Sequence, residues 1–352
     1  MEPAVRSLIL TAILLPALAA GDAPPGAERP EPAVIAPLAA ASLLLDVKAL
    51  PDRHLVAVGE RGDVLVSSDD GASWRQSPAP ARATLTAVYF ADAAHGWAVG
   101  HDEAILGTAD GGATWTLSHY APEREQPLLG VWFDGHGHGL AVGAYSTIYR
   151  SADAGATWQS APFEPAPLIA PAAAAAPKPA ARSKHDEMRD EVWVVQPHLT
   201  SITADARGRL YMTGEAGHLY RSDDGGDHWL ALPSPYEGSF FGALPLDGDA
   251  VLVFGLRGHL YRSEDAGRSW HALASGTESL LAGAARLPDG SIVIVGLAGV
   301  VLVSHDGGRS FAVHQEADRK GFNAVAPVPG GIIVSGEAGV RRLTLAELAP
   351  RS

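Results

Sequence analysis

The sequence contains no cysteine among its 352 residues, and this absence excludes disulfide bonds and lipid attachment through a cysteine thiol. Stability must therefore come from a packed core. Basic residues are also scarce, because 26 Lys and Arg stand against 40 Asp and Glu, for a formal net charge of -14. Nucleic acids and anionic lipids are bound through clustered positive charge, so this balance argues against both as partners.

An apolar run lies within the first twenty residues. Ser7 to Ala20 is apolar, follows Arg6 and contains Ala17-Leu18-Ala19, a small-x-small cleavage pattern. The run is too short to span a membrane comfortably as a permanent helix. We therefore predict a signal peptide over residues 1–19 and a flexible N-terminus over residues 20–31. This pattern predicts an exported protein, periplasmic or secreted, with no direct membrane span after cleavage.

What the sequence does contain is a short motif that occurs six times. Its pattern is Ser or Thr, any residue, Asp, any residue, Gly, any residue, a hydroxyl residue and an aromatic residue; residues 67–74 are the first copy, and only His228 departs at the hydroxyl position. The closing aromatics, at positions 74, 115, 158, 229, 270 and 311, follow one another after 41, 43, 71, 41 and 41 residues. A period near 41 with one long step indicates a repeat architecture that carries one insertion.

A second landmark occurs about 15 residues before the position of each aromatic: an apolar stretch that ends in glycine. It is found seven times, at Gly59, Gly100, Gly143, Gly214, Gly255, Gly296 and Gly336. Around it, short alternating stretches separated by Gly and Asp turns predict four strands per repeat, A to D, which describes a propeller blade. We therefore predict an all-β fold, a seven-bladed β-propeller with four-stranded blades, over residues 32–348.

The seventh repeat has no such motif and no fourth strand. We predict that residues 32–38, which contain Val34 and Ile35, supply this strand and close the ring, since an open ring would leave unpaired strand edges. The long step contains an insertion over residues 163–192, between blades three and four. It is rich in Ala and Pro and then charged, which is typical of a solvated surface loop, although a docking arm stays open as the alternative.

The repeated Asp indicates a structural role. Its carboxylate can accept hydrogen bonds from the N–H groups of a turn, the Gly permits a positive φ, and the aromatic packs into the core. Equivalent aspartates in every blade cannot all be catalytic. The structural aspartates are Asp69, Asp110, Asp153, Asp224, Asp265 and Asp306.

The six Asp boxes, the stretch Gly96-Trp97-Ala98-Val99-Gly100 and the Gly-Glu-x-Gly turns resemble the photosystem II assembly and stability factor family. That family consists of exported seven-bladed propellers of the BNR or Asp-box type, and the resemblance covers about residues 43–345. It implies a non-enzymatic assembly factor that binds an envelope or membrane protein. For a bacterial relative, which we expect here, the implied partners include a transporter complex of the envelope.

Sialidases and other glycosidases also carry Asp boxes, so an Asp-box glycoside hydrolase or a carbohydrate-binding propeller is the alternative. A sialidase-like site needs an Arg cluster, a Tyr activated by Glu and an acidic Asp. Its usual Arg-Ile-Pro signature is missing, because no Arg here precedes Ile. A general glycosidase needs only two carboxylates at a suitable separation, which leaves that class open.

Two further patterns have ordinary interpretations. Residues 134–138, Asp-Gly-His-Gly-His, could offer metal ligands, but they align with the turn at residues 92–96 and are interpreted as a turn. The pairs Tyr149-Arg150, Tyr220-Arg221 and Tyr261-Arg262 are expected at surface strand positions, with the Arg stems packed on Tyr; a basic stripe across three neighbouring blades is the alternative. We predict a monomer with no metal and no cofactor.

Departures from the repeat indicate where a partner would bind. Because strands alternate in direction, the B–C turns and D–A loops share one face. Five repeats have a Gly-x-x-Gly B–C turn, whereas repeats two and three differ there, and the D–A loop after repeat two is longer. The candidate partner face comprises His101, Asp102, Glu103, His119, Tyr120, Glu123, Arg124 and Tyr145.

Overall fold

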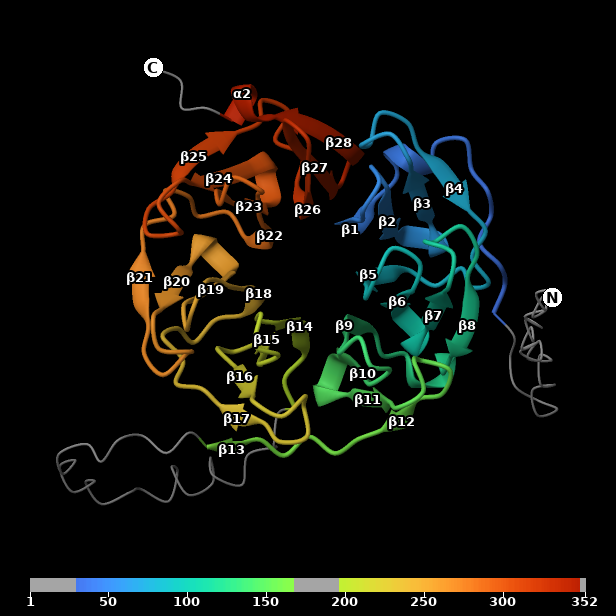
Figure 1. The fold of residues 1–352 in the computed structure, drawn as a ribbon, viewed down its shortest axis with the longest axis horizontal. Helices are drawn as coiled ribbons and strands as arrows, with labels where there is room; N and C mark the ends of the chain where they lie inside the picture. The colour runs from blue at the N-terminus through green and yellow to red at the C-terminus, as the bar shows by residue number, and fades with distance from the viewer. Residues whose placement is uncertain (1–29, 168–195, 349–352) are drawn as a thin grey trace, which may run out of the picture.

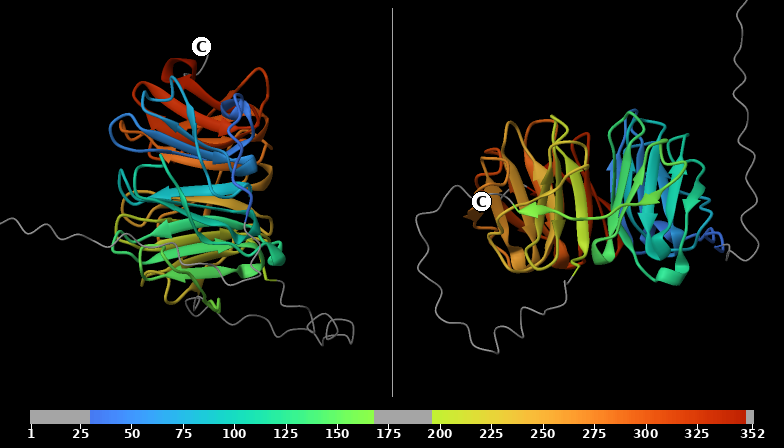
Figure 2. Two further views of the ribbon diagram at one scale, coloured as in Figure 1. Left: turned by 90° about the vertical axis from the view of Figure 1, so that its right-hand side faces the viewer. Right: turned by 90° about the horizontal axis from the view of Figure 1, so that it is seen from below.

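Seven β-sheets stand around a central axis in the computed structural model, which describes residues 30–167 and 196–348 (Figure 1). The prediction of a seven-bladed propeller is confirmed. In the side views the molecule is a thick disc, with the strands running between its two faces (Figure 2). The predicted signal peptide, and the predicted N-terminal segment apart from residues 30–31, lie outside the described residues, as do residues 168–192 of the predicted insertion.

The first three blades follow the predicted order, each with four antiparallel strands that are neighbours in sequence. Blade one comprises β1 (Leu44–Ala49), β2 (Leu55–Gly59), β3 (Val64–Ser67) and β4 (Arg75–Ser77). Blade two comprises β5 (Leu85–Phe90), β6 (Gly96–Gly100), β7 (Ile105–Thr108) and β8 (Thr116–His119). Blade three comprises β9 (Leu128–Phe133), β10 (Gly139–Gly143), β11 (Ile148–Ser151) and β12 (Gln159–Ser160).

Blades four to six repeat this arrangement. Blade four comprises β14 (Leu199–Ala204), β15 (Leu210–Gly214), β16 (Leu219–Ser222) and β17 (Leu230–Ala231). Blade five comprises β18 (Phe240–Pro245), β19 (Val251–Gly255), β20 (Leu260–Ser263) and β21 (His271–Leu273). Blade six comprises β22 (Leu281–Arg286), β23 (Ile292–Gly296), β24 (Val300–Ser304) and β25 (Ala312–Gln315).

Blade seven has three strands, β26 (Phe322–Val328), β27 (Gly331–Gly336) and β28 (Gly339–Thr344), followed by the short helix α2 (Leu345–Leu348). The other helical elements are single 3₁₀ turns. They are η1 (Ala39–Ala41), η2 (Glu60–Gly62), η3 (His101–Glu103), η4 (Pro122–Arg124), η5 (Ala144–Ser146), η6 (Leu256–Gly258) and η7 (Leu297–Gly299).

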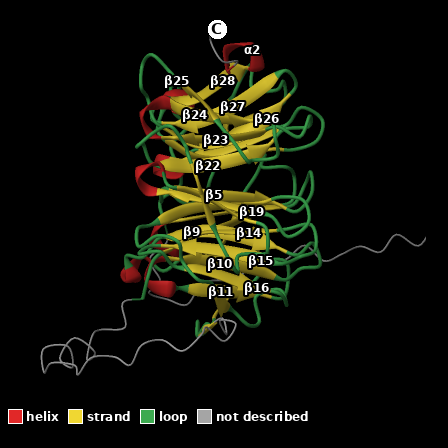
Figure 3. Cartoon of the chain, turned by 90° about the vertical axis from the view of Figure 1, so that its left-hand side faces the viewer, coloured by secondary structure: helices red, strands yellow, loops and turns green. Residues whose placement is uncertain are grey.

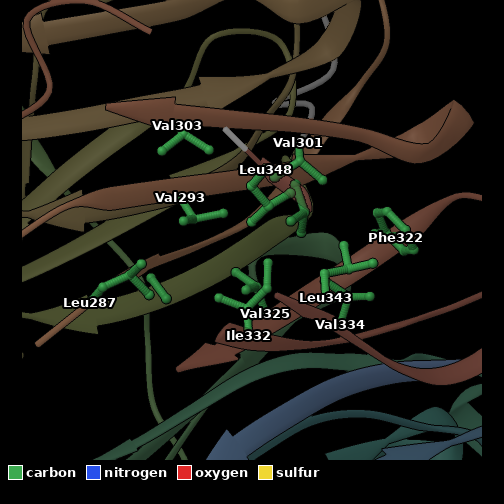
Figure 4. Packing of buried hydrophobic residues seen from close by; sticks show 12 residues of the cluster. Leu287, Val293, Val301, Val303, Phe322, Val325, Ile332, Val334, Leu343 and Leu348 are labelled. Carbon is green, nitrogen blue, oxygen red and sulfur yellow. The ribbon is translucent and has the colours of Figure 1, made fainter. Parts of the chain in front are cut away.

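The core lies between neighbouring blades, because each sheet is covered on both faces. The B strands β2, β6, β10, β15, β19 and β23 are buried at every residue, which explains their nearly continuous apolar sequences. Between blades six and seven, Val293 and Val301 pack with Phe322, Ile332 and other apolar side chains (Figure 4). The box aromatic Trp115 is 7% exposed and packs in the equivalent cluster between blades one and two.

Hydrogen bonds link neighbouring blades on the Asp-box face. In each box a backbone carbonyl, either that of the residue before the glycine or, at Gly226, that of the glycine itself, accepts a hydrogen bond from a side chain of the preceding blade. Arg221, for example, donates to the Ala266 oxygen at 2.9 Å, and Arg262 donates to the Gly307 oxygen at 2.6 Å. The six donors, in chain order, are His54, Trp97, Arg150, Arg221, Arg262 and Arg342. We call these contacts the interblade clasps.

The expectation of surface positions for the Tyr-Arg pairs was therefore wrong for Arg221 and Arg262, whereas the Arg150 side chain is 32% exposed. Arg221 and Arg262 are buried rather than placed at the surface, and their guanidinium groups serve as clasps. The physical reason for Arg221 is that the Ala266 carbonyl belongs to a buried residue at a blade interface and needs a donor that reaches across from the preceding C strand. An arginine offers both the length and the several N–H groups for that role.

The predicted closing strand was also wrong. Residues 32–38 form no strand; Ala33 donates its N–H to the Ala79 oxygen, and Ala36 donates its N–H to Gln76 Oε1. These bonds hold the segment along the outer edge of blade one, and its two prolines could not have donated to a ladder. The ring instead closes through packing of β1 on β26 and β27 and through two hydrogen bonds between blades seven and one. The donors are Asn323 Nδ2 to the Leu44 oxygen at 3.0 Å and Arg342 Nη1 to the Asp70 oxygen at 3.2 Å.

The start of the insertion is built into the propeller. Phe163 packs edge-on against Tyr220, with ring centroids 4.9 Å apart, and also against Trp229. Strand β13 (Ala166–Pro167) then pairs in parallel with β17 and adds a fifth strand to blade four. The segment from residue 161 to 167 therefore ties the outer edge of blade three to blade four, so residues 163–167 of the predicted loop are part of the propeller.

Candidate binding face

The two faces of the disc carry different kinds of connection. The A–B turns and the Asp boxes lie on one face, and the B–C turns lie on the other with the D–A loops. Most of the B–C turns form 3₁₀ turns, which appear in red along one side of the disc (Figure 3). We call this second face the B–C face.

Glycine is required at the third position of the B–C turn in most blades. At Gly62, Gly217 and Gly258 the backbone φ lies between 71° and 79°, and a Cβ would approach a D–A loop carbonyl oxygen to 2.0–2.2 Å. Blades two and three place Glu103 and Ser146 there, with φ of 50° and 57°. An L-residue in this conformation costs about 1–2 kcal/mol, so these two turns carry that cost at a position where most of the other turns have glycine.

The longer D–A loop of blade two makes room for Glu103. The loop carries η4, and it is bonded to the turn through Ala121 N–H to the Asp102 oxygen at 2.9 Å. The N–H of Glu103 in turn donates to the Gln126 oxygen at 3.0 Å. Turn and loop therefore form one unit, and the departures noted in the sequence are structurally coupled.

Glu103 is completely buried, and its charge is only partly compensated. Its Oε2 accepts a 2.6 Å hydrogen bond from the Tyr149 hydroxyl, whereas Oε1 has no hydrogen-bond partner. His119 Nε2 lies 3.5 Å from Oε2, and Arg124 Nη1 lies 3.7 Å from Oε1. A buried carboxylate without full hydrogen bonding is costly, so this residue opposes stability both by strain and by desolvation.

The Tyr149–Glu103 pair does not provide the activated tyrosine of a sialidase. Burial of Tyr149, and then its hydrogen bond to Glu103, raise the pKa of the phenol well above its usual value. The hydroxyl thus stays protonated and acts as a donor. Tyr149 is itself buried under the surface of blade three, which keeps it away from a substrate.

An aromatic groove opens on the B–C face between blades three and four, with a volume of about 410 Å³. It is lined by Arg124, Tyr145, Ser146, Thr147, Ile148, Ser160, Ala161, Pro162, Phe163, Pro165, Gln196, Pro197, His218 and Tyr220. Tyr145 is 54% exposed and packs edge-on against His198, with ring centroids 4.8 Å apart. Arg124 is the single charged residue of this lining.

The residues predicted for the partner face occupy three different places in the structure. Arg124 and Tyr145 line the groove, whereas Glu103 and His119 form the layer beneath Arg124. The remaining candidates lie on the same face around the blade-two turn and loop: His101, Asp102, Tyr120 and Glu123. The Tyr120 hydroxyl lies 3.5 Å from Asp102 Oδ2, so these two also contact each other.

Sequence reasoning missed most of the groove walls. Phe163 stands at the start of a stretch that composition assigns to a loop, and Tyr220 belongs to a repeated Tyr-Arg pair that gives no local sign of a groove. Only Tyr145 carried a signal, because it replaces a repeat residue in the turn. The rest depends on how the segment from 161 to 167 crosses between blades.

The Asp-box carboxylates are used in their own turns. Asp69 Oδ1 accepts the Ser73 N–H at 2.9 Å and the Ser67 hydroxyl at 2.8 Å, and Oδ2 accepts the Ser73 hydroxyl at 2.6 Å. The same contacts recur in the other boxes, with the His228 ring replacing the hydroxyl in blade four. Hydrogen bonds from Ser73 and Ser67 lower the pKa of Asp69 to about 2. This geometry supports the structural role that repetition predicted.

Two other cavities bear on catalysis. The central cavity, about 490 Å³, has Asp46 as the single carboxylate among its lining residues, and that side chain accepts the Val88 N–H and pairs with Lys48. A cavity of about 720 Å³ on the Asp-box face is lined by Asp134, Asp153, Asp224 and Asp227. Burial would raise the pKa of Asp224, but hydrogen bonds from the His228 backbone and ring lower it to about 2. A glycosidase acid needs a raised pKa, and this carboxyl has a lowered one.

The His-bearing turn that could have offered metal ligands is internally bonded. Asp134 accepts hydrogen bonds from the N–H groups of His136 and His138 and from the His138 ring at 2.8 Å. Among residues 30–167 and 196–348, no group of three or more metal-ligating side chains gathers in one place.

Residues 72–166 match a family model described as photosynthesis system II assembly factor YCF48. That stretch is similar to the photosystem II assembly factor family. The resemblance inferred from the repeats is thereby confirmed. A search of curated proteins gave no match.

Solved structures of this family share the fold. YCF48 bound to D1 peptide is 18% identical at a TM-score of 0.62, over 90% of this chain and 99% of that chain. YCF48 from Cyanidioschyzon merolae is 15% identical at the same TM-score, over 87% of this chain and 97% of that chain. A GH74 xyloglucanase from Xanthomonas campestris is 17% identical at a TM-score of 0.64, over 91% of this chain but 54% of that chain. At these identities the likeness shows the fold alone.

Within the described part of the chain, no helix has the length and apolar character that crossing a membrane requires.

Proposed function

We propose that this protein is an exported, non-enzymatic binding factor that holds an envelope or membrane protein during assembly. A photosystem subunit or a transporter complex of the envelope would fit this role. The proposal is supported by the resemblance to YCF48, one structure of which is bound to D1 peptide. Localisation in the periplasm or outside the cell, and a monomeric state, belong to the same proposal.

The observation that carries the proposal is the convergence of repeat departures on one groove. Glu103 and Ser146 adopt strained turns, the D–A loop is lengthened beside them, and Arg124 and Tyr145 reach the groove from these elements. Costly features that a repeat does not require are retained where they serve binding or catalysis. Since the groove lining offers no pair of carboxylates, binding is the role that its chemistry supports.

The proposal is tested by site-specific crosslinking in envelope extract. A photoreactive phenylalanine at Tyr145 should capture a defined envelope or membrane protein, identified by mass spectrometry. The same group at Val313, which is 43% exposed on blade six, is the matched control and should not capture it. Equal capture at both positions, or capture at Val313 alone, would place the binding face elsewhere.

The glycosidase alternative is tested separately. The purified mature protein should release no product from aryl glycosides or sialosides. Turnover that disappears when a carboxylate of the central or box-face cavity is replaced would contradict the binding proposal.

A further inference from the structure

We infer that the groove between blades three and four binds an extended, proline-rich segment of the partner protein. This inference rests on the proposed function and specifies which kind of chain the groove accepts. It is drawn from three properties of the lining: its aromatic side chains, its shortage of backbone donors and its unused side-chain donors.

Aromatic side chains line the groove in two groups. Tyr145, supported by His198, forms one group, and Phe163 with Tyr220 forms the other. His218 extends the second group, with its ring stacked 5.9 Å from that of Tyr220. Grooves lined by aromatic rings suit prolyl rings and other compact apolar side chains, as in domains that bind Pro-rich segments.

The groove cannot bind a peptide by forming a strand ladder along this lining. Pro162, Pro165 and Pro197 belong to the lining and have no N–H to donate. The Pro197 carbonyl already accepts the N–H of Ser146, at 2.9 Å. The outer edge of β17, the nearest strand of blade four, is paired with β13. Recognition must therefore come from side chains.

Suitable side-chain donors are present and unused. Among the residues that the structure describes, the hydroxyl groups of Tyr145 and Tyr220 have no hydrogen-bond acceptor, and the Arg124 guanidinium has an ion-pair partner, Glu103, only at 3.7 Å. Burial raises the pKa of Tyr220 to about 12, so its hydroxyl stays a donor. A polyproline II segment has no internal hydrogen bonds and presents its carbonyl oxygens outward, so it supplies the acceptors that these donors need.

The charge of the groove indicates which charged residues the bound peptide segment can carry. Arg124 is the single charged lining residue in a chain with a net charge of -14. Glu103, fixed in its strained turn 3.7 Å from Arg124, positions that guanidinium at the mouth of the groove. A segment that carries Lys or Arg beside its prolines would be repelled at this end, whereas carbonyl oxygens or an acidic side chain would be attracted.

The test uses a short fluorescent peptide that repeats Pro-Pro-Leu, and a control peptide with Ala in place of each Pro. Fluorescence anisotropy with the purified mature protein should show binding of the proline peptide and not of the control. Tyr145→Ala should weaken this binding about tenfold, and Tyr145→Phe, which keeps the ring but removes a donor, should weaken it less. Tyr236→Phe, on the same face in the loop before blade five, is the matched control and should leave it unchanged.

Three results would overturn the inference. The first is no binding of the proline peptide, and the second is binding that Tyr145→Ala leaves unchanged. The third is binding that emerges only after residues 168–195 are replaced by a Gly-Ser linker, because the occupant would then be the chain's own Ala- and Pro-rich segment. In each case crosslinking from Tyr145 to an envelope protein could still succeed, so failure of this inference is distinguishable from failure of the proposed function.

Discussion

The Asp-box face and the B–C face are built from the same repeat but treat their carboxylates differently. On the Asp-box face, the box carboxylates are bonded in their own turns and the six clasps bond carbonyls of the next blade, although Arg221 Nε and Trp229 Nε1 are buried there without a hydrogen-bond partner. On the B–C face, around blades two and three, Glu103 Oε1 and His119 Nε2 are buried without hydrogen-bond partners. The comparison teaches that the carboxylates of the regular repeat are satisfied within their turns, whereas Glu103, which replaces a repeat glycine, is only partly satisfied.

The largest expected effect lies at the blade interface below the Asp-box face. Trp115→Ala removes a buried ring that packs between blades one and two, and it should lower the free energy of unfolding by about 3–5 kcal/mol. Chemical denaturation monitored by circular dichroism measures this loss. An unchanged midpoint would show that the box aromatic does not belong to the core.

Removal of one interblade clasp should lower the free energy of unfolding by a smaller but measurable amount. Arg221→Met keeps the stem and removes the donor to the Ala266 carbonyl, so an acceptor at a buried interface is left unpaired at a cost of about 1–3 kcal/mol. Arg207→Met, which removes an exposed pair with Asp249 on the same face, is the matched control and should cost at most about 1 kcal/mol. Equal losses for the two variants would mean that the clasps are ordinary surface contacts.

On the B–C face we expect a substitution that increases stability rather than decreasing it. Glu103→Gly combined with Tyr149→Phe should raise the free energy of unfolding by about 1 kcal/mol, because strain and a buried unpaired carboxylate are removed together. Glu103→Gly alone should gain less, since the Tyr149 hydroxyl then has no acceptor. Thermal denaturation compares the two variants, and a loss of stability in the double variant would make the turn a structural necessity. Partner capture through Tyr145 should weaken in both, because Arg124 loses its counter-charge.

The smallest effect on stability is expected for the exposed side chains of the candidate face. His101→Ala with Tyr145→Ala should change the free energy of unfolding by no more than about 0.5 kcal/mol, since both side chains are exposed. The same variant should lose partner capture in a pull-down assay from envelope extract. Normal capture by a stably folded variant would show that the departures around blades two and three are drift.

Much of the fold was predictable because the repeat encodes it locally. The predicted glycine landmarks Gly59, Gly100 and Gly143 end the strands β2, β6 and β10. Alternation, glycine turns and Asp boxes act within a few residues, so a single repeat carries enough information to place its strands. The face that carries the departures followed from strand direction alone.

The errors arose where the decisive contact is remote in sequence. Residues 32–38 look like a strand, but Gln76 and Ala79 hold them on blade one. Arg221 looks like a surface residue, but its partner is 45 residues away in the next box. The sequence around an arginine does not show whether its side chain points to solvent or donates a hydrogen bond to a buried carbonyl of another blade.

The sequence by itself therefore determined the number of blades, the order of their strands and the two turns that depart from the repeat, because these depend on short-range periodicity and turn chemistry. Only the tertiary structure decided how the ring closes, which side chains clasp neighbouring blades, and that Arg124 and Tyr145 meet Phe163 and Tyr220 in one groove. Those features depend on which surfaces are brought together when seven sheets pack around one axis, and burial at such interfaces is a property of the assembled ring rather than of any segment.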